Sequence, residues 1–181
     1  MLTATIDKTK EWTVDDYMQL EEGLLAQLLD GALIMSPAPT PLHQRILRRI
    51  YDNLKTVDHK GEFFFSPIDV YMDKKNVLQP DLIFISAENS NVISERGIDG
   101  PPDLVVEVVS PSNSYIDRNF KKKKYLEFGV KEVWILDPAN KTLEIYADNV
   151  DKPALYLASE GQIRSDVIHK LSFNLEAIFS T

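Results

Sequence analysis

The run from Pro102 to Val109 constrains the fold of this chain more than any other segment. It reads Pro-Asp-Leu-Val-Val-Glu-Val-Val, and from Leu104 onward it is apolar at every position except Glu107. A short apolar run without strict alternation is typical of a central strand covered on both faces. The run therefore predicts an α/β or α+β fold in which helices flank a mixed central sheet.

The length and composition predict one globular domain spanning residues 1–181. The chain has 181 residues, of which 44% are hydrophobic and 27% are charged, enough to build a sizeable core. It has no cysteine, which excludes disulfides, thiolate zinc sites and cysteine nucleophiles. Residues 1–10 lack the apolar centre of a signal peptide, and no run approaches the ~18 apolar residues of a membrane span. We therefore expect a cytoplasmic protein with no membrane partner.

The overall charge limits how the chain could bind nucleic acid. It carries 28 acidic and 20 basic side chains, a formal net charge of −8. Such a surface does not attract DNA as a whole, so binding would need a local basic patch. The candidates are Arg45, Arg48, Arg49, Lys55 and the run from Lys122 to Lys124, although each group could equally be a solvated helix face.

Turn residues and apolar periodicity predict the remaining elements. Asp30-Gly31 between two apolar runs predicts a type I′ hairpin over 24–35. Apolar residues at every fourth position predict an amphipathic helix from Leu42 to Leu54. Further helices are expected over 13–20, with a capping box at its start, and over 114–128, ended by Gly129. Strands are expected over 63–65, 69–71, 82–85, 104–109 and 133–136, with C-terminal antiparallel strands over 142–146, 154–157 and 163–167 and a closing segment over 175–179.

Two acids stand at strand positions where they could share a cation. Asp81 follows Pro80 at the start of a predicted strand, and Glu107 lies in the middle of another among valines. A carboxylate buried in a strand is costly unless it is protonated, paired or bound to a metal. If the two strands are neighbours, both acids could bind Mg²⁺, which takes oxygen ligands. Taken singly, an Asp after Pro is more often a turn residue, and a buried Glu is more often ion-paired.

A lysine-rich helix follows the second acid. At about 100° per residue, Asp117, Lys121 and Tyr125 fall on one ridge, with Lys124 close beside it. Four consecutive lysines sweep most of the helix circumference, so one of Lys121 and Lys124 is expected on the side facing the sheet. The spacing does not choose between them, and a lysine there could simply cover apolar surface with its stem.

Together these segments resemble a known family. The matching segments are Gln79-Pro80-Asp81, Asp103 to Ser112, Asp117-Arg118 with Lys121 and Tyr125, and Gly129 to Pro138. Thr13 to Tyr17, Asp30-Gly31 and the Ser-Pro segment before His43 match as well. The chain resembles, over nearly its whole length, the restriction endonuclease branch of the PD-(D/E)XK nuclease superfamily that is catalogued as a bacterial domain of unknown function.

The resemblance implies a site and a reaction. Asp81 and Glu107 correspond to the metal-binding acids. The superfamily lysine position is Val109 here, and in this branch the lysine comes from the following helix, which implies Lys121. Gln27 stands where relatives often carry a glutamate before the Asp-Gly turn, and its carbonyl could still bind the metal.

The implied activity is Mg²⁺- or Mn²⁺-dependent hydrolysis of DNA phosphodiester bonds by a homodimer. One alternative is a catalytically silent relative that binds DNA or a protein, which Gln27 and the acidic net charge favour. Another is an enzyme acting on RNA or small nucleotides. His43 follows a loop at a helix start and could contribute to the site, although a lone histidine is more often structural.

Overall fold

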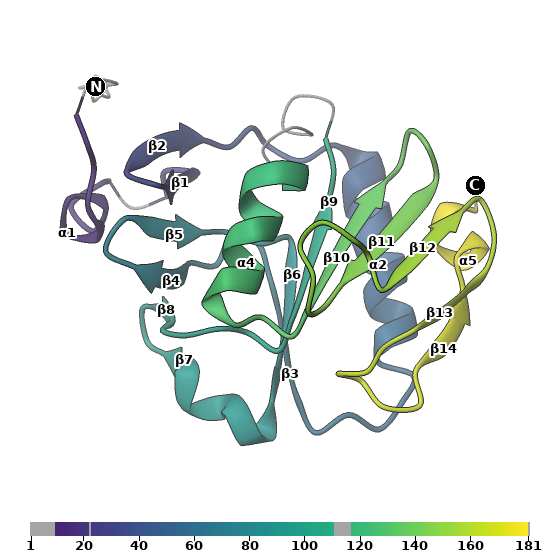
Figure 1. Cartoon of the computed structure of the whole chain (residues 1–181). Helices are drawn as coiled ribbons and strands as arrows, with labels where there is room; N and C mark the ends of the chain where they lie inside the picture. Colours follow the sequence, from purple (N-terminus) through teal and green to yellow (C-terminus); the bar gives the residue numbers. More distant parts are fainter. Residues whose placement is uncertain (1–9, 22, 111–116, 181) are drawn as a thin grey trace.

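The computed structural model describes residues 10–21, 23–110 and 117–180 and confirms the predicted mixed α/β architecture. Its central element is a six-stranded sheet in the order β12-β11-β10-β9-β6-β3 (Figure 1). β9 pairs in parallel with β10 and antiparallel with β6, so the sheet is mixed. Its strands are β3 (Gly61–Phe65), β6 (Leu82–Ser86), β9 (Leu104–Val108), β10 (Glu132–Asp137), β11 (Thr142–Tyr146) and β12 (Leu155–Ala158).

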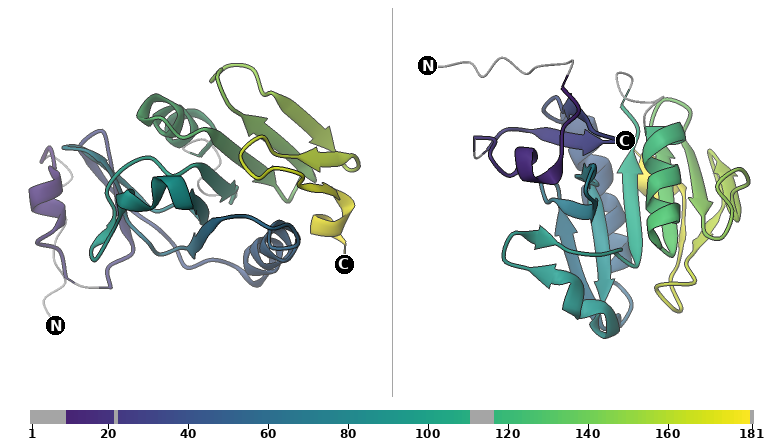
Figure 2. Two further views of the ribbon diagram at one scale, coloured as in Figure 1. Left: turned by 90° about the horizontal axis from the view of Figure 1, so that it is seen from below. Right: turned by 60° about the vertical axis from the view of Figure 1, so that its left-hand side comes forward.

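Each face of the central sheet has its own hydrophobic core. Val106 and Val108 of β9 pack with Ile46 and Ile50 of α2 (Pro41–Leu54) on one face. Val105 packs with residues of α4 (Lys122–Phe128) on the other face. The views in Figure 2 show α2 and α4 on opposite sides of the sheet. Every residue of β9 is buried, as the apolar run predicts for a strand covered on both faces.

A second six-stranded sheet has the order β2-β1-β5-β4-β8-β7 and lies beside the first. The predicted hairpin is present, and its turn residues Asp30 and Gly31 have φ of 48° and 77°, as a type I′ turn requires. Residues 79–81 lead from this sheet into β6 of the central one. The strands are β1 (Ala26–Leu29), β2 (Ala32–Met35), β4 (Val70–Asp73), β5 (Asn76–Leu78), β7 (Ile93–Ser94) and β8 (Gly97–Ile98).

Short elements complete the fold. α1 (Val14–Tyr17) begins with the predicted capping box, in which Thr13 and Asp16 bond to each other's backbone N–H groups. α5 (Glu176–Phe179) packs beside α2, and η1 is a 3-10 helix over Ala87–Val92. β13 (Gln162–Arg164) pairs with β14 (Ser172–Asn174) in a separate two-stranded sheet.

Several predictions differ from the structure. β5, β7, β8 and β14 were not expected, the helix expected over 13–20 spans only Val14–Tyr17, and the strand expected over 163–167 ends at Arg164. The helix expected over 114–128 begins as a π-helical turn, η2 (Asp117–Lys121), before α4; residues 114–116 lie outside the described part of the chain. Gly129 ends α4 with φ 104°, as predicted. Within the described residues, no helix is both long and apolar enough to cross a membrane.

Candidate functional site

Asp81 directly precedes β6, and Glu107 lies in the neighbouring strand β9 of the central sheet. In the antiparallel ladder between β6 and β9, Leu82 pairs with Val106, so one further step along the ladder sets Asp81 opposite Glu107. Asp81 Oδ2 accepts a hydrogen bond of 2.7 Å from the backbone N–H of Val108, which ties the carboxylate to the end of β9. The two acids therefore lie at one end of the same pair of strands.

The Glu107 side chain is buried, with 2% of the residue exposed. Its Oε1 accepts hydrogen bonds from Lys121 Nζ at 3.2 Å and from the Tyr125 hydroxyl at 2.5 Å. A buried carboxylate is tolerated when charge and hydrogen bonds compensate its lost hydration, and Lys121 supplies the charge. Tyr125 is a contact of the site to which the sequence alone assigned no role. Its spacing of four residues from Lys121 was the available signal.

The structure brings Lys121, and not Lys124, to Glu107. Only 6% of Lys121, the last residue of η2, is exposed, and its Nζ faces Glu107 of β9. Lys124 points instead to the β1–β2 turn, where its Nζ lies 2.6 Å from Asp30 Oδ1. That hydrogen bond holds the pKa of Asp30 below its ordinary value. Of the two lysines, Lys121 is therefore the one that faces the sheet.

His43 contacts Asp81 from the start of α2. The helix begins at Pro41, and the Thr40 side chain caps it by accepting a hydrogen bond from the His43 backbone N–H. This cap places the imidazole over the end of β6, where Nε2 lies 2.9 Å from Asp81 Oδ2. α2 and α4, on opposite faces of the sheet, thus each contribute a side chain at the end of β9.

Gln27 supports the segment that leads to Asp81. Only 5% of the residue is exposed. Its Oε1 accepts a hydrogen bond of 2.9 Å from the backbone N–H of Gln79, and its Nε2 donates to Ser36 Oγ at 2.8 Å. The carbonyl oxygen keeps a second lone pair, so metal binding by Gln27 stays a prediction.

The donor set at this end of the sheet suits a hard cation. Among the described residues, no three or more His, Cys, Asp or Glu side chains gather as a metal centre. Two carboxylates from adjacent strands are nevertheless what Mg²⁺ commonly takes from a protein, since it retains several waters. Binding of a partly hydrated cation by Asp81 and Glu107 therefore stays a prediction.

Most side chains of the expected basic patch contact other groups of the same protein. Arg49 donates to the backbone carbonyls of Ile178, at 3.0 Å, and of Ser180. Lys55 pairs with Asp52 and Lys123 with Glu127, while Lys122 lies 4.1 Å from the centre of the Tyr146 ring. Burial holds the pKa of Lys122 below its ordinary value. Arg45 and Arg48 are exposed on α2 and form no ion pair within the described part of the chain.

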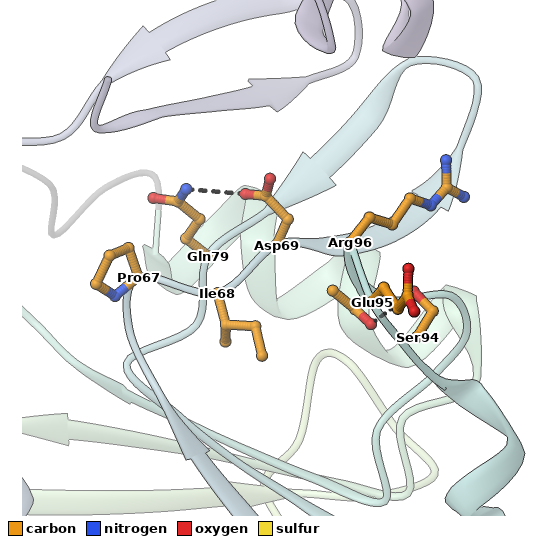
Figure 3. Close-up of a pocket in the computed structure, with 8 residues that line it drawn as sticks. Pro67, Ile68, Asp69, Gln79, Ser94, Glu95 and Arg96 are labelled. Carbon is orange, nitrogen blue, oxygen red and sulfur yellow. Dashed lines mark hydrogen bonds between the residues drawn. The ribbon is translucent and has the colours of Figure 1, made fainter. Parts of the chain in front are cut away.

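A shallow pocket of about 290 Å³ lies on the second sheet (Figure 3). At its base Asp69 Oδ1 accepts hydrogen bonds of 2.8 Å from Gln79 Nε2 and from the Tyr17 hydroxyl. Burial, followed by the charge of Asp69, raises the pKa of Tyr71 to about 12, which keeps that phenol a donor to Asp69. Neither of the two candidate metal-binding acids lines this pocket, whose lining residues are Pro67, Ile68, Asp69, Gln79, Ser94, Glu95, Arg96 and Gly97.

Comparisons with known proteins identify the family and the fold of the chain. The model of the Uma2 family, described as "Putative restriction endonuclease", matches residues 14–176. A crystal structure described as a "putative nuclease belonging to DUF820" from Anabaena variabilis superposes with a TM-score of 0.76. It shares 18% identity, covering 93% of this chain and 97% of that one. No curated protein matches the sequence. The structural match shows a shared fold, and the family model spans most of the sequence, so the chain belongs to the Uma2 family.

Proposed function

We propose that this protein is a divalent-metal-dependent endonuclease that hydrolyses phosphodiester bonds of DNA. One observation carries the proposal: buried Glu107 has the Lys121 ammonium at 3.2 Å and stands beside Asp81 of the neighbouring strand. Two carboxylates with an adjacent ammonium suit a reaction in which water attacks a phosphate. Membership of a family described by nuclease activity supports the same reaction.

Each side chain has a distinct task in the proposed reaction. Asp81 and Glu107 hold Mg²⁺ or Mn²⁺, and the bound cation supplies a charge that polarises the phosphoryl oxygen and acidifies a water. Lys121 stabilises the negative charge that develops on the phosphate, or orients the attacking water. Glu107 Oε1 holds the Lys121 ammonium in place, and the Tyr125 hydroxyl bonds the same oxygen. No covalent intermediate on the protein is required.

Nicking of supercoiled plasmid in Mg²⁺ tests the proposal. Lys121→Ala removes the ammonium from the site and should slow nicking by about 100-fold, the usual cost of losing one transition-state donor. Glu107→Ala should abolish nicking. The matched control is Lys124→Ala on the same helix, which loses only the ion pair with Asp30 and should cut within a few-fold of wild type. Nicking by Glu107→Ala at the wild-type rate would overturn the proposal.

Gln27 favours a second candidate, a silent relative that binds DNA or a protein. Relatives with a glutamate at this position would add a charge that the amide lacks, and both polar atoms of Gln27 already bond within the protein. Wild-type protein that binds Mn²⁺ but leaves plasmid uncut would favour this alternative over the nuclease. Cleavage of single-stranded RNA, measured in the same buffer, separates a ribonuclease from a deoxyribonuclease.

We also propose that the active form is a homodimer, because cleavage of both strands of DNA calls for two sites. Light scattering of the purified chain, whose monomer mass is 20.6 kDa, tests this directly. A mass near twice that value supports the dimer, and a monomer at the concentrations used for nicking contradicts it.

A further inference from the structure

The two carboxylate oxygens of Asp81 have different surroundings. Oδ2 accepts two hydrogen bonds, from the Val108 backbone N–H at 2.7 Å and from His43 Nε2 at 2.9 Å. Oδ1 has no hydrogen-bond partner among the residues that the structure describes. The side chain is 17% exposed, so the carboxylate is largely withdrawn from bulk water.

The direction of the contact with His43 follows from hydrogen-bond chemistry. An ionised carboxylate only accepts, so the ring nitrogen that faces Oδ2 must carry the proton. The other ring nitrogen, Nδ1, is buried and has no partner within the described residues. The bond to Asp81 is therefore the one side-chain hydrogen bond of His43 in that part of the chain, and replacing the imidazole disturbs little else.

We propose that His43 is a positioning residue for the divalent cation. Together with the Val108 N–H it fixes Oδ2 of Asp81 and leaves Oδ1 as the single oxygen that Asp81 offers to the cation. His43 itself touches neither the cation nor the phosphate. This inference rests on the proposed function, because it assigns the imidazole relative to the ion held by Asp81 and Glu107. Ligating carboxylates are commonly oriented by such outer hydrogen bonds.

Calorimetric titration with Mn²⁺ in the absence of DNA tests this role without relying on activity. His43→Ala should weaken Mn²⁺ binding by about tenfold, the lower end of what loss of an outer partner costs. His43→Gln, whose Nε2 amide can donate to the same oxygen, should restore affinity to within about threefold of wild type. His169→Ala, at an exposed histidine, serves as the control and should bind as wild type does.

A second variant tests which oxygen binds the ion. The amide oxygen introduced by Asp81→Asn can accept both hydrogen bonds at the Oδ2 position, which leaves an NH₂ group where Oδ1 stood. This variant should fold with nearly wild-type stability in urea and lose Mn²⁺ binding. It remains informative even if His43→Ala fails to fold.

The outcomes separate the two proposals. If Asp81→Asn abolishes Mn²⁺ binding while His43→Ala binds as wild type does, the positioning role is overturned and the proposed metal site stands. If Asp81→Asn binds Mn²⁺ as tightly as wild type, the Oδ1 assignment is overturned. If wild-type protein takes up no Mn²⁺, both this inference and the proposed metal-dependent function are overturned.

Discussion

Three buried acids on β9, β10 and the segment before them show how surroundings decide what a carboxylate does. Asp103 accepts hydrogen bonds from the Ser86 backbone N–H and from Lys131 Nζ. Glu132 accepts hydrogen bonds from Trp134 Nε1 and from the backbone N–H of Asp166, which holds the C-terminal segment on the sheet. The carboxylates of Asp103 and Glu132 thus have structural hydrogen-bond partners. Glu107 differs in that its charge partner, Lys121, comes from a helical turn on one face of the sheet, and the residue one ladder step beyond Leu82 is Asp81.

The sequence could place these acids but not distinguish their tasks. Alternation along a strand puts Asp103 and Glu107 on the same face, and nothing local separates them. What separates them is their neighbours, which come from elements far away in the chain. The contact between His43 and Asp81 spans 38 residues and depends on where the first turn of α2 rests on the sheet. The position of α2 on the sheet depends on how the side chains pack, and this packing cannot be predicted from a single sequence.

Asp103 provides a pH-dependent test at the level of one residue. Burial alone would raise its pKa, but hydrogen bonds led by Lys131 hold the folded-state pKa below the ordinary value of 3.8. A lowered folded-state pKa contributes stability above pH 3.8, and that stability is lost as pH falls through the folded value. Asp103→Asn should therefore destabilise the protein by about 1–3 kcal/mol at pH 7. The difference should shrink below pH 3.8.

Urea unfolding of wild type and Asp103→Asn at pH 7, 5 and 3 measures this change. Asp148→Asn, at an exposed position, is the control and should change the unfolding free energy little at any of these pH values. An equal loss of stability for Asp103→Asn at pH 7 and pH 3 would contradict the assigned role of the ionised carboxylate.

Among the elements, those with strong local signals were predictable. The hairpin over 24–35 follows from Asp-Gly, and α2 from apolar residues at every fourth position; both are present. β5 and β14 have three residues each, so they offer no period to detect; β5 pairs with β4 and β1, and β14 pairs with β13. Short strands of this kind are fixed by tertiary structure.

Lys121 and Lys124 lie close together around the helix axis, which is why the spacing could not choose between them. At about 100° per residue they are only about 60° apart, so both lie near the ridge that carries Tyr125. The contacts that separate them, with Glu107 and with Asp30, come from elements far away in the chain. The π-helical turn η2 before α4 was not predicted either, because no pattern in the sequence indicates it.

Gly129 offers a test of α4, the helix that follows Lys121. It adopts φ 104° at the end of α4, where a residue with a Cβ is strained although that atom would make only ordinary contact with Pro101, at 3.7 Å. Gly129→Ala should cost about 1 kcal/mol or more in the free energy of unfolding, and Gly129→Asn should cost less because asparagine tolerates this conformation better. Denaturant unfolding of both variants measures which of them is less stable. Equal stability of the two variants would argue against a conformational cause.

At the scale of the whole molecule, the site lies where several separate parts meet. The second sheet delivers Asp81 through the segment held by Gln27, α2 brings His43, and α4 with η2 brings Lys121. The mixed sheet itself was predictable, because the apolar run of β9 requires cover on both faces. The second sheet was not, since it depends on pairing between β1 and β5, which lie far apart in the sequence. That the chain forms one domain over residues 1–181 stays a prediction.

The charge distribution predicts weak, salt-sensitive DNA binding. With a net charge of −8 and most of the basic patch engaged internally, Arg45 and Arg48 on α2 are the cations best placed to contact phosphates near His43. Log affinity falls linearly with log salt concentration, and the double variant Arg45→Ala/Arg48→Ala should make this negative slope shallower by about 2. Fluorescence anisotropy with labelled duplex DNA in Ca²⁺ measures the slope. Lys141→Ala/Lys170→Ala is the charge-matched control, and an equal effect of both doubles would exclude a local patch on α2.

The π turn before the lysine run has a consequence for changes in chain length. A π turn holds one residue more than the ordinary helix that would replace it, so loss of one residue from 117–120 would convert η2 to ordinary helix. Because Tyr125 and Lys121 both bond Glu107, the part of the helix that follows would keep its place on the sheet. The extra residue therefore lies ahead of the ammonium and can be removed without taking it from the acid.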